Sequence, residues 1–84
     1  MSDNKEFEAI KVLREEHIDD HNLIRLWIVK WKWGSSPVLE KRRIWIDKEG
    51  VELTRKAVGL NANDIIHISK IQDEVVKILE GEYK

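Results

Sequence analysis

The sequence predicts an α+β domain, in which an antiparallel β-sheet of three to four strands lies between an N-terminal and a C-terminal helix. Residues 4–18 repeat apolar side chains every three or four positions, as a helix does. Residues 23–47 are rich in β-branched and aromatic side chains, which is typical of strands. Residues 61–80 return to a helical repeat. A chain of 84 residues has room for one domain.

The N-terminal segment, residues 1–21, is predicted to be an acidic helix that precedes the main domain, residues 22–84. Its apolar side chains would form one stripe along such a helix. They are Phe7, Ile10, Leu13 and His17 or Ile18. The sequence Asp19-Asp20-His21-Asn22 ends the pattern and predicts a turn.

The central segment predicts three strands. The first begins at Leu23 and ends before the turn sequence Gly34-Ser35-Ser36-Pro37. The second covers about residues 38–47, and Lys48-Glu49-Gly50 predicts the next turn. Residues 51–60 are expected to form a loop and a short third strand.

The C-terminal helix is predicted to be capped within Asn61-Ala62-Asn63-Asp64, to reach about Glu80 and to end at Gly81. Its apolar side chains make a broad face. They are Ile65, Ile68, Ile71, Val75, Ile78 and Leu79.

The charge of the chain is segregated, although the net charge is only −1. Residues 1–22 hold three basic and seven acidic side chains, whereas residues 23–60 hold nine basic and four acidic ones, a net of +5. All four tryptophans lie in this basic middle: Trp27, Trp31, Trp33 and Trp45. A local basic field can attract a polyanion even when the whole chain is nearly neutral.

Strand alternation predicts which of these side chains share a face. If Ser35-Ser36 form a two-residue hairpin loop, Trp33 would pair with Val38, and Trp31 with Glu40. One face then looks like core: Trp27, Val29, Trp31, Trp33, Val38 and Ile44. The other is a platform of four cations and one ring, with Leu26, Ile28 and Leu39 between them: Lys30, Lys32, Lys41, Arg43 and Trp45.

This platform suits a single-stranded nucleic acid, because phosphates pair with the cations and unpaired bases stack on tryptophan. The alternative interpretation is that the cations only keep the open face hydrated and that the tryptophans are core.

The segment Arg42-Arg43-Ile44-Trp45-Ile46-Asp47-Lys48-Glu49-Gly50, followed by Arg55-Lys56-Ala57-Val58-Gly59-Leu60-Asn61, resembles the positive-cofactor-four family of transcriptional coactivators. In that family, a strand with an arginine and a tryptophan leads through an Asp-x-Glu-Gly turn to a basic segment and a helix. The resemblance covers about residues 25–80. It implies a curved antiparallel sheet, a channel for single-stranded DNA on paired sheets, and a C-terminal helix that mediates dimerisation.

The resemblance implies a role for individual residues. Arg42 corresponds to the strand arginine of the family, Trp45 to its stacking tryptophan, and Arg55 and Lys56 to its basic pair. Ala57 stands where the family has glycine, Leu53 lies where it has a basic residue, and the N-terminal helix is additional. Arg42 and Trp45 differ in strand parity, and a twisted strand, or a bulge near Arg42-Arg43, could bring them to one face. The implied dimer interface contains Ile66, Ile71, Val75, Ile78 and Leu79.

We therefore expect a non-enzymatic homodimer that binds single-stranded DNA, with RNA as the alternative ligand, in transcription or DNA maintenance. The transcription machinery is a further expected partner, and the expected location is cytoplasmic or nucleoid-associated. Two other classes stay open. One is a protein-interaction module that uses the exposed tryptophan and the apolar helix, and the other is a winged-helix-like regulator that binds duplex DNA.

Other classes of function lack a sequence signal. The chain has no cysteine, no glycine-rich phosphate loop and no carboxylate pair in an apolar context, so no enzyme and no cofactor are expected. His17 and His21 have the spacing of metal ligands on a helix, but we expect no metal, because histidine is also favourable at a helix C-terminus. No apolar run reaches the roughly 18–20 residues that a membrane span needs, so no membrane contact is expected.

Overall fold

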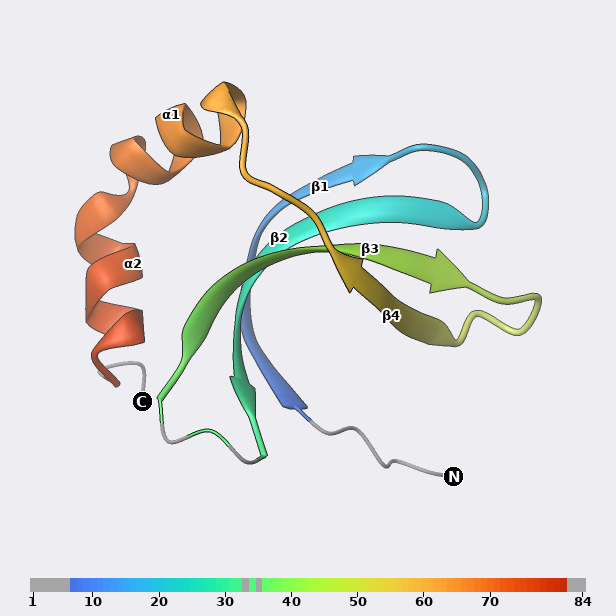
Figure 1. Cartoon of the computed structure of the whole chain (residues 1–84), viewed down its shortest axis with the longest axis horizontal. Coiled ribbons are helices and arrows are strands. Elements are labelled where there is room, and N and C mark those ends of the chain that lie inside the picture. Colours follow the sequence, from blue (N-terminus) through green and yellow to red (C-terminus); the bar gives the residue numbers. More distant parts are fainter. Residues whose placement is uncertain (1–6, 33, 35, 82–84) are drawn as a thin grey trace.

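The computed structural model of the protein describes residues 7–32, 34 and 36–81. These residues form four strands followed by two helices, shown in Figure 1: β1 (Phe7–His17), β2 (Asn22–Trp31), β3 (Val38–Ile46), β4 (Glu52–Ala57), α1 (Ala62–Lys70) and α2 (Gln72–Leu79). The strands make one antiparallel sheet in the order β1-β2-β3-β4. The sheet bends strongly, and the helices lie on the outer side of the bend (Figure 1). The predicted α+β class is confirmed, with an antiparallel sheet that precedes the C-terminal helical segment.

The predicted N-terminal helix is wrong, because residues 7–17 form strand β1 and pair with β2 along their length. The physical reason is a pair of irregularities in β1, at Ile10 and at Leu13, where the register shifts by one residue. A bulge adds a residue and so changes the alternation of side chains. Ile10 and Leu13, three residues apart, consequently pack against the same cluster around Ile28. Residues three apart also share one face of a helix, so this spacing led to the helix prediction.

The two central strands keep the predicted partition of faces but not the predicted pairing. Glu40 lies opposite Trp27 rather than Trp31, and Val38 lies opposite Val29, so the pairing has slipped by four residues. An even slip preserves which side chains share a face, because the side-chain period of a strand is two. The predicted pairing of Trp33 lies outside the described residues.

The inner face of the bent sheet carries the first core cluster. Its buried members are Leu23, Trp27, Val29 and Ile44, against which Phe7, Trp31 and Ile46 pack. Arg25 is buried on this face, since its guanidinium bridges Glu15 of β1 and Glu52 of β4. Arg25 thus links the central strand β2 to both edge strands, β1 and β4, on the inner side of the bend.

The outer face carries the second core cluster, which fastens the helices. Ile28 of β2 packs against Val75 and Ile78 of α2, and all three are buried. The helical segment was predicted as one helix over residues 61–80, but it is broken at Ile71, which ends α1 and precedes α2. The cap predicted within residues 61–64 is confirmed, and the structure places it at Asn61, in a reciprocal capping box with Asp64.

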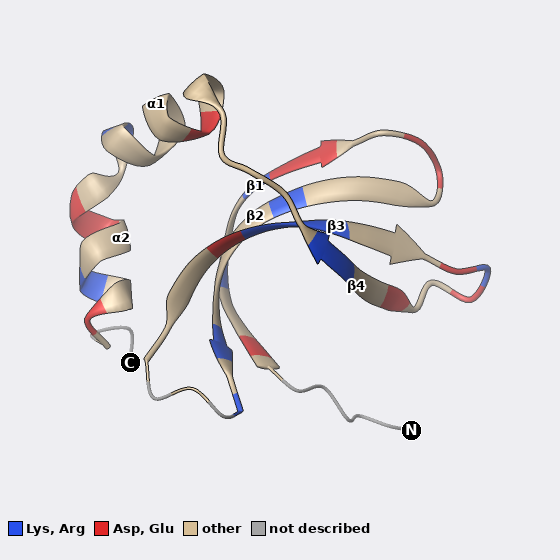
Figure 2. Ribbon diagram, in the orientation of Figure 1, with Lys and Arg blue, Asp and Glu red and all other residues tan. Residues whose placement is uncertain are grey.

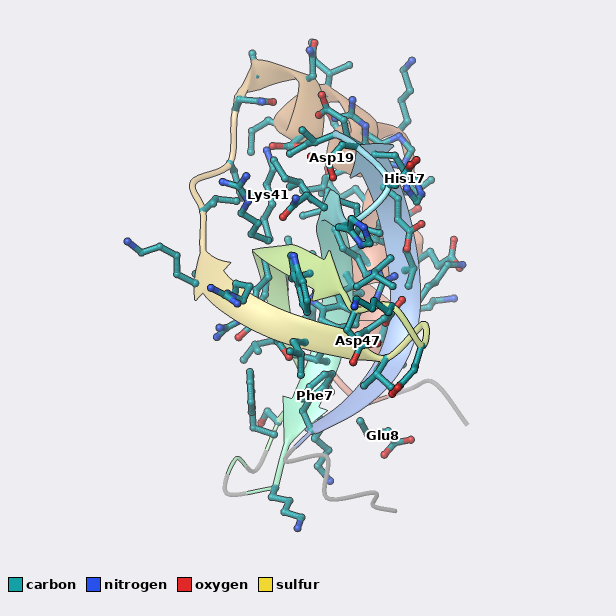
Figure 3. The ribbon with its side chains drawn as sticks, turned by 90° about the vertical axis from the view of Figure 1, so that its right-hand side faces the viewer. Phe7, Glu8, His17, Asp19, Lys41 and Asp47 are labelled. Atoms are coloured by element: carbon teal, nitrogen blue, oxygen red, sulfur yellow. The ribbon has the colours of Figure 1, made fainter. Side chains whose placement is uncertain are left out.

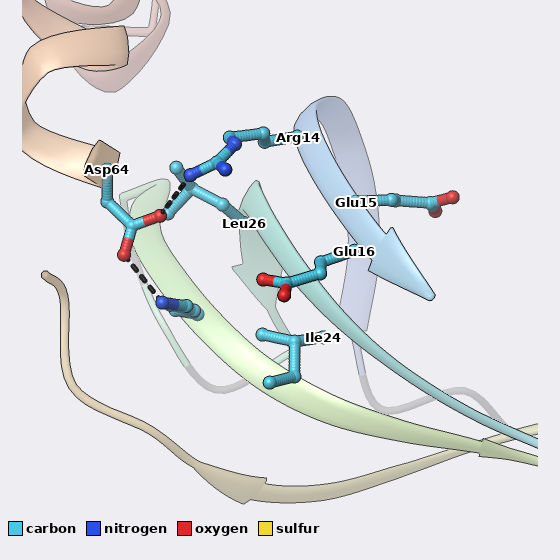
Figure 4. Close-up of a pocket in the computed structure, with 7 residues that line it drawn as sticks. Arg14, Glu15, Glu16, Ile24, Leu26 and Asp64 are labelled. Carbon is cyan, nitrogen blue, oxygen red and sulfur yellow. Dashed lines mark hydrogen bonds and ion pairs between the residues drawn. The ribbon is translucent and has the colours of Figure 1, made fainter. Parts of the chain in front are cut away.

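Asp64 also joins α1 to the sheet. Its carboxylate accepts hydrogen bonds from Lys41 Nζ at 2.6 Å and from Arg14 Nη1 at 3.0 Å, the two dashed contacts in Figure 4. Lys11 forms a further ion pair with Glu74 of α2. His67 contacts the carbonyl oxygen of Leu13 through Nε2, so α1 also satisfies the backbone at one bulge of β1.

Candidate nucleic-acid interface

An open hollow lies on the outer face of the sheet, on the part of β3 farthest from the β2–β3 connection. It is lined by one amide, one aromatic ring and three cations: Asn22, Trp45, Arg43, Arg55 and Lys56. Asn22 is opposite Trp45 in the pairing of β2 with β3, so the two side chains stand side by side. Figure 2 shows the basic segments of β3 and β4 next to each other. Four of the eight predicted binding residues therefore come together here.

The two cations from β4 share one face because of an irregularity in the sheet. Arg42 pairs with Ala57 and Ile44 pairs with Thr54, so two residues of β4, Arg55 and Lys56, stand opposite Arg43 alone. In a regular strand, consecutive side chains would point to opposite faces. A twisted strand, or a bulge near Arg42-Arg43, was one way to bring Arg42 and Trp45 to one face, but the extra residue of the irregularity lies in β4.

Arg42 lies on the opposite face from Trp45 and reaches the hollow only through the backbone. Its guanidinium donates hydrogen bonds to the carboxylate of Glu40 and lies over the ring of Trp31. Arg42 Nη1 also donates to the backbone carbonyl of Arg55 at 3.0 Å. Arg42 therefore holds the bulge that presents Arg55.

The cations of the predicted set differ in whether a carboxylate neutralises them. Lys41 is nearly buried and paired with Asp64, and Arg42 is paired with Glu40. Arg43, Arg55 and Lys56 are exposed, and no carboxylate of the described residues pairs with them. The hollow is thus the place on the sheet where three uncompensated cations surround an aromatic ring.

Lys30 and Lys32 lie away from the hollow, at the opposite end of β2. Lys30 lies opposite Glu8 in the register of β1 with β2, and Lys32 follows the end of the strand. On the outer face, the segment between them and the hollow is covered by the helices that pack on Ile28. The predicted platform is therefore not continuous.

Two residues that were not predicted to bind nucleic acid complete the site. The ring of His21 stacks on Trp45 with ring centroids 6.1 Å apart and an interplanar angle of 26°. His21 Nδ1 is 2.8 Å from the carbonyl oxygen of Ile46, so this nitrogen carries the proton in the neutral ring. Leu53 of β4 pairs with Trp45 from the other side and is 45% exposed.

The signals for these residues in the sequence were weak. His21 and Asn22 were placed in a turn, and Leu53 was noted only as a departure from a basic residue. Figure 3 shows Phe7 and His17 at the two ends of β1, with Asp19 in the turn beyond. This turn brings His21 and Asn22 to Trp45, and its position depended on β1 being a strand.

The five residues of the implied dimer interface are not all accessible. Val75 and Ile78 are buried within the chain against Ile28 and hold α2 to the sheet. Ile71 and Leu79 are partly buried beside them, whereas Ile66 is 55% exposed. In this conformation, Val75 and Ile78 have no surface left for a second copy.

Among the described residues, no group of three or more potential metal ligands is close enough to hold an ion. His17 faces Glu15, with 3.5 Å between Nε2 and Oε1, while His21 contacts Trp45 and Ile46. No helix in the described ranges is long and apolar enough to cross a membrane.

Comparisons with protein-family models, with curated proteins and with solved structures find no match to this chain. The resemblance to the positive-cofactor-four family therefore rests on the sequence motif of residues 42–61 alone.

Proposed function

We propose that this protein binds single-stranded DNA, without enzymatic activity, through the hollow around Trp45. The observation that carries the proposal is the grouping of Arg43, Arg55 and Lys56 around this partly exposed ring. Phosphates need uncompensated cations, and an unpaired base gains about 1–3 kcal/mol by stacking on an aromatic side chain. The sequence motif shared with single-stranded-DNA-binding coactivators supports the same ligand.

The geometry favours a single strand over a duplex. Reading of duplex DNA commonly uses a helix in the major groove. Among the described helices, α1 exposes one lysine, Lys70, while its Asp64 is buried, and α2 carries Asp73 and Glu74 beside Lys77. Neither offers a basic recognition face, so the winged-helix alternative has less support.

The first test compares single-stranded with duplex DNA of equal length by fluorescence anisotropy at several salt concentrations. We expect tighter binding of the single strand. The slope of log K against log salt should be about −2, because each of three neutralised phosphates contributes about −0.7. Equal affinity for both forms, or no binding, would overturn the proposal.

A charge-matched pair of variants tests the location of the site. Changing Arg43, Arg55 and Lys56 to glutamine should remove most of the salt dependence. The control changes Lys48, Lys70 and Lys77 to glutamine, which lowers the net charge equally at exposed positions outside the hollow. If both variants lose affinity equally, the attraction is a property of overall charge and not of this site.

Trp45 is tested by its fluorescence and its stacking. Trp45→Ala should weaken binding about fivefold to a hundredfold, whereas Trp45→Phe should keep most of the affinity. Trp45→Phe should also lose the oligonucleotide-dependent quenching of tryptophan emission. Quenching that persists in Trp45→Phe would place the stacking ring elsewhere.

We also propose that the protein acts as a homodimer, with α1 rather than α2 at the interface. Ile65 and Ile66 of α1 are 53% and 55% exposed, whereas Val75 and Ile78 of α2 are buried, so α1 has apolar surface available for a second copy. Light scattering should give the mass of two chains for the protein and of one chain for Ile66→Glu. A monomer at all concentrations would instead leave this face to another protein, which is the interaction-module alternative.

A further inference from the structure

The side chain of Arg42 lies on the inner face of the sheet and is held there by Glu40 and Trp31. Arg42 Nε donates to Glu40 Oε1 at 2.9 Å, and Arg42 Nη2 donates to Glu40 Oε2 at 3.3 Å. Trp31 Nε1 donates to the same carboxylate at 2.9 Å, and the guanidinium carbon is 5.1 Å from the centre of the Trp31 ring. A guanidinium is planar, so these contacts also fix the direction of its third nitrogen, Nη1.

Arg42 Nη1 reaches the backbone of the irregularity in β4. It donates to the carbonyl oxygen of Arg55 at 3.0 Å. A bulge disrupts the ladder of backbone hydrogen bonds, so the backbone groups at the bulge need other partners. This carbonyl belongs to the planar peptide unit that joins Arg55 to Lys56. Its direction therefore sets how the two cationic side chains are turned relative to each other.

We infer that Arg42 is a positioning residue of the single-strand site, which acts from the opposite face of the sheet. It holds the peptide between Arg55 and Lys56 so that both cations line the hollow. This inference rests on the proposed function. Arg42 does not itself offer a free charge to the phosphates, because its side chain is only 23% exposed and Glu40 neutralises it. Its contribution to binding therefore passes through Arg55 and Lys56.

Arg42→Lys separates this role from that of a positive charge. Lysine keeps the charge, but its one ammonium nitrogen cannot reproduce the flat fork that bonds Glu40 on one side and the carbonyl of Arg55 on the other. We expect the variant to bind a fluorescent single strand of DNA about threefold to tenfold more weakly, the ratio that corresponds to one net hydrogen bond. The slope of log K against log salt should become shallower by about 0.7, the value of one phosphate contact.

The same change in two further backgrounds, measured at low salt, identifies the residues through which Arg42 acts. With Arg55 and Lys56 both changed to glutamine, Arg42→Lys should cause no further loss, because the side chains that it positions no longer carry charge. The matched control is Arg43→Gln, in which Arg42→Lys should cause its full loss, since Arg43 belongs to β3 and not to the bulge. A general loss of folded protein would weaken binding equally in both backgrounds, and equal losses would overturn the inference.

A second variant, Glu40→Leu, tests the same network by its sign. Removing a negative charge should tighten the binding of a polyanion if charge alone matters. Because the change releases the guanidinium of Arg42, we expect weaker binding instead; thermal unfolding shows whether the variant is folded. Tighter or unchanged binding by either Glu40→Leu or Arg42→Lys would overturn the inference and leave the proposed function intact. Absence of binding by the unchanged protein would overturn both proposals.

Discussion

Asp64→Asn is expected to be among the most damaging single changes of one polar side chain in this protein. Asp64 is 1% exposed, and its carboxylate accepts from Lys41, from Arg14 and from the backbone N–H of Asn61. Burial alone raises the pKa of this carboxyl. The hydrogen bonds from Lys41 and Asn61, with the charges of Lys41 and Arg14, more than offset burial and lower the pKa below its usual value.

The expected loss of stability in Asp64→Asn follows from the charged groups that the change leaves without a partner. The side chain of Lys41 is 10% exposed, so without Asp64 it becomes a nearly buried ammonium group with no opposite charge. Breaking a buried ion pair from one side costs about 3–5 kcal/mol. Arg14 adds little, because it is more than one-third exposed and water can solvate it. A chain of 84 residues has about 4–13 kcal/mol of stability in total, so the variant should lose a large share of it.

Urea unfolding measures this loss, with Asp73→Asn as the control, since Asp73 is exposed in the first turn of α2. The double variant Lys41→Gln, Asp64→Asn should recover part of the stability, because it leaves no unpaired buried charge. A loss below about 1 kcal/mol in Asp64→Asn would refute the reasoning, as that is the value for an exposed ion pair.

The same contact predicts a dependence on pH. The pKa of Asp64 is lowered in the folded chain, so its stabilisation is complete above the unfolded value of about 3.9 and is lost as the pH falls through the folded pKa. The unchanged protein should therefore lose stability below about pH 4 more steeply than Asp64→Asn. Parallel acid limbs for the two proteins would show that Asp64 is not responsible.

Three further changes test the inner face and a turn. Trp27→Ala should cost about 3–5 kcal/mol in urea unfolding, because Trp27 is 4% exposed in the core cluster and the change leaves a large cavity. Arg25→Ala should cost less, about 2 kcal/mol, since the carboxylates of Glu15 and Glu52 that it leaves are partly exposed to water; a neutral effect would show that Arg25 does not brace the bend. Gly50→Ala should lower the stability by about 1–2 kcal/mol through backbone strain alone, because Gly50 has a φ of 82° and an added Cβ would meet nothing within 4 Å.

Features that depend on neighbours along the chain could be predicted from the sequence. Alternation in β2 and β3 correctly separated Trp27 and Ile44 from Arg43 and Trp45, and the partition survived the slipped register because the slip was even. The cap at Asn61 and the turn at Gly50 were likewise predictable, since each depends on hydrogen bonds over a few residues.

Features that depend on residues far apart in the sequence could be seen only in the folded chain. Ile10 and Leu13 show the spacing of a helix, and only pairing with β2, through two bulges, makes that segment a strand. Lys41 belonged with the other cations by parity, but it is neutralised by Asp64, which lies 23 residues further along the chain. Local spacing cannot encode a partner at that distance, so the sequence alone could not separate the paired cations from the free ones.

The candidate site shows the same division. Trp45, Arg43, Arg55 and Lys56 were predicted from strand parity and from the resemblance, and the fold brings them together. The residues around them, His21 and Asn22, come from a turn between two strands, one of which had been predicted as a helix. Local patterns thus identified the strands and their faces, whereas packing between segments determined which charges stay free and what surrounds the tryptophan.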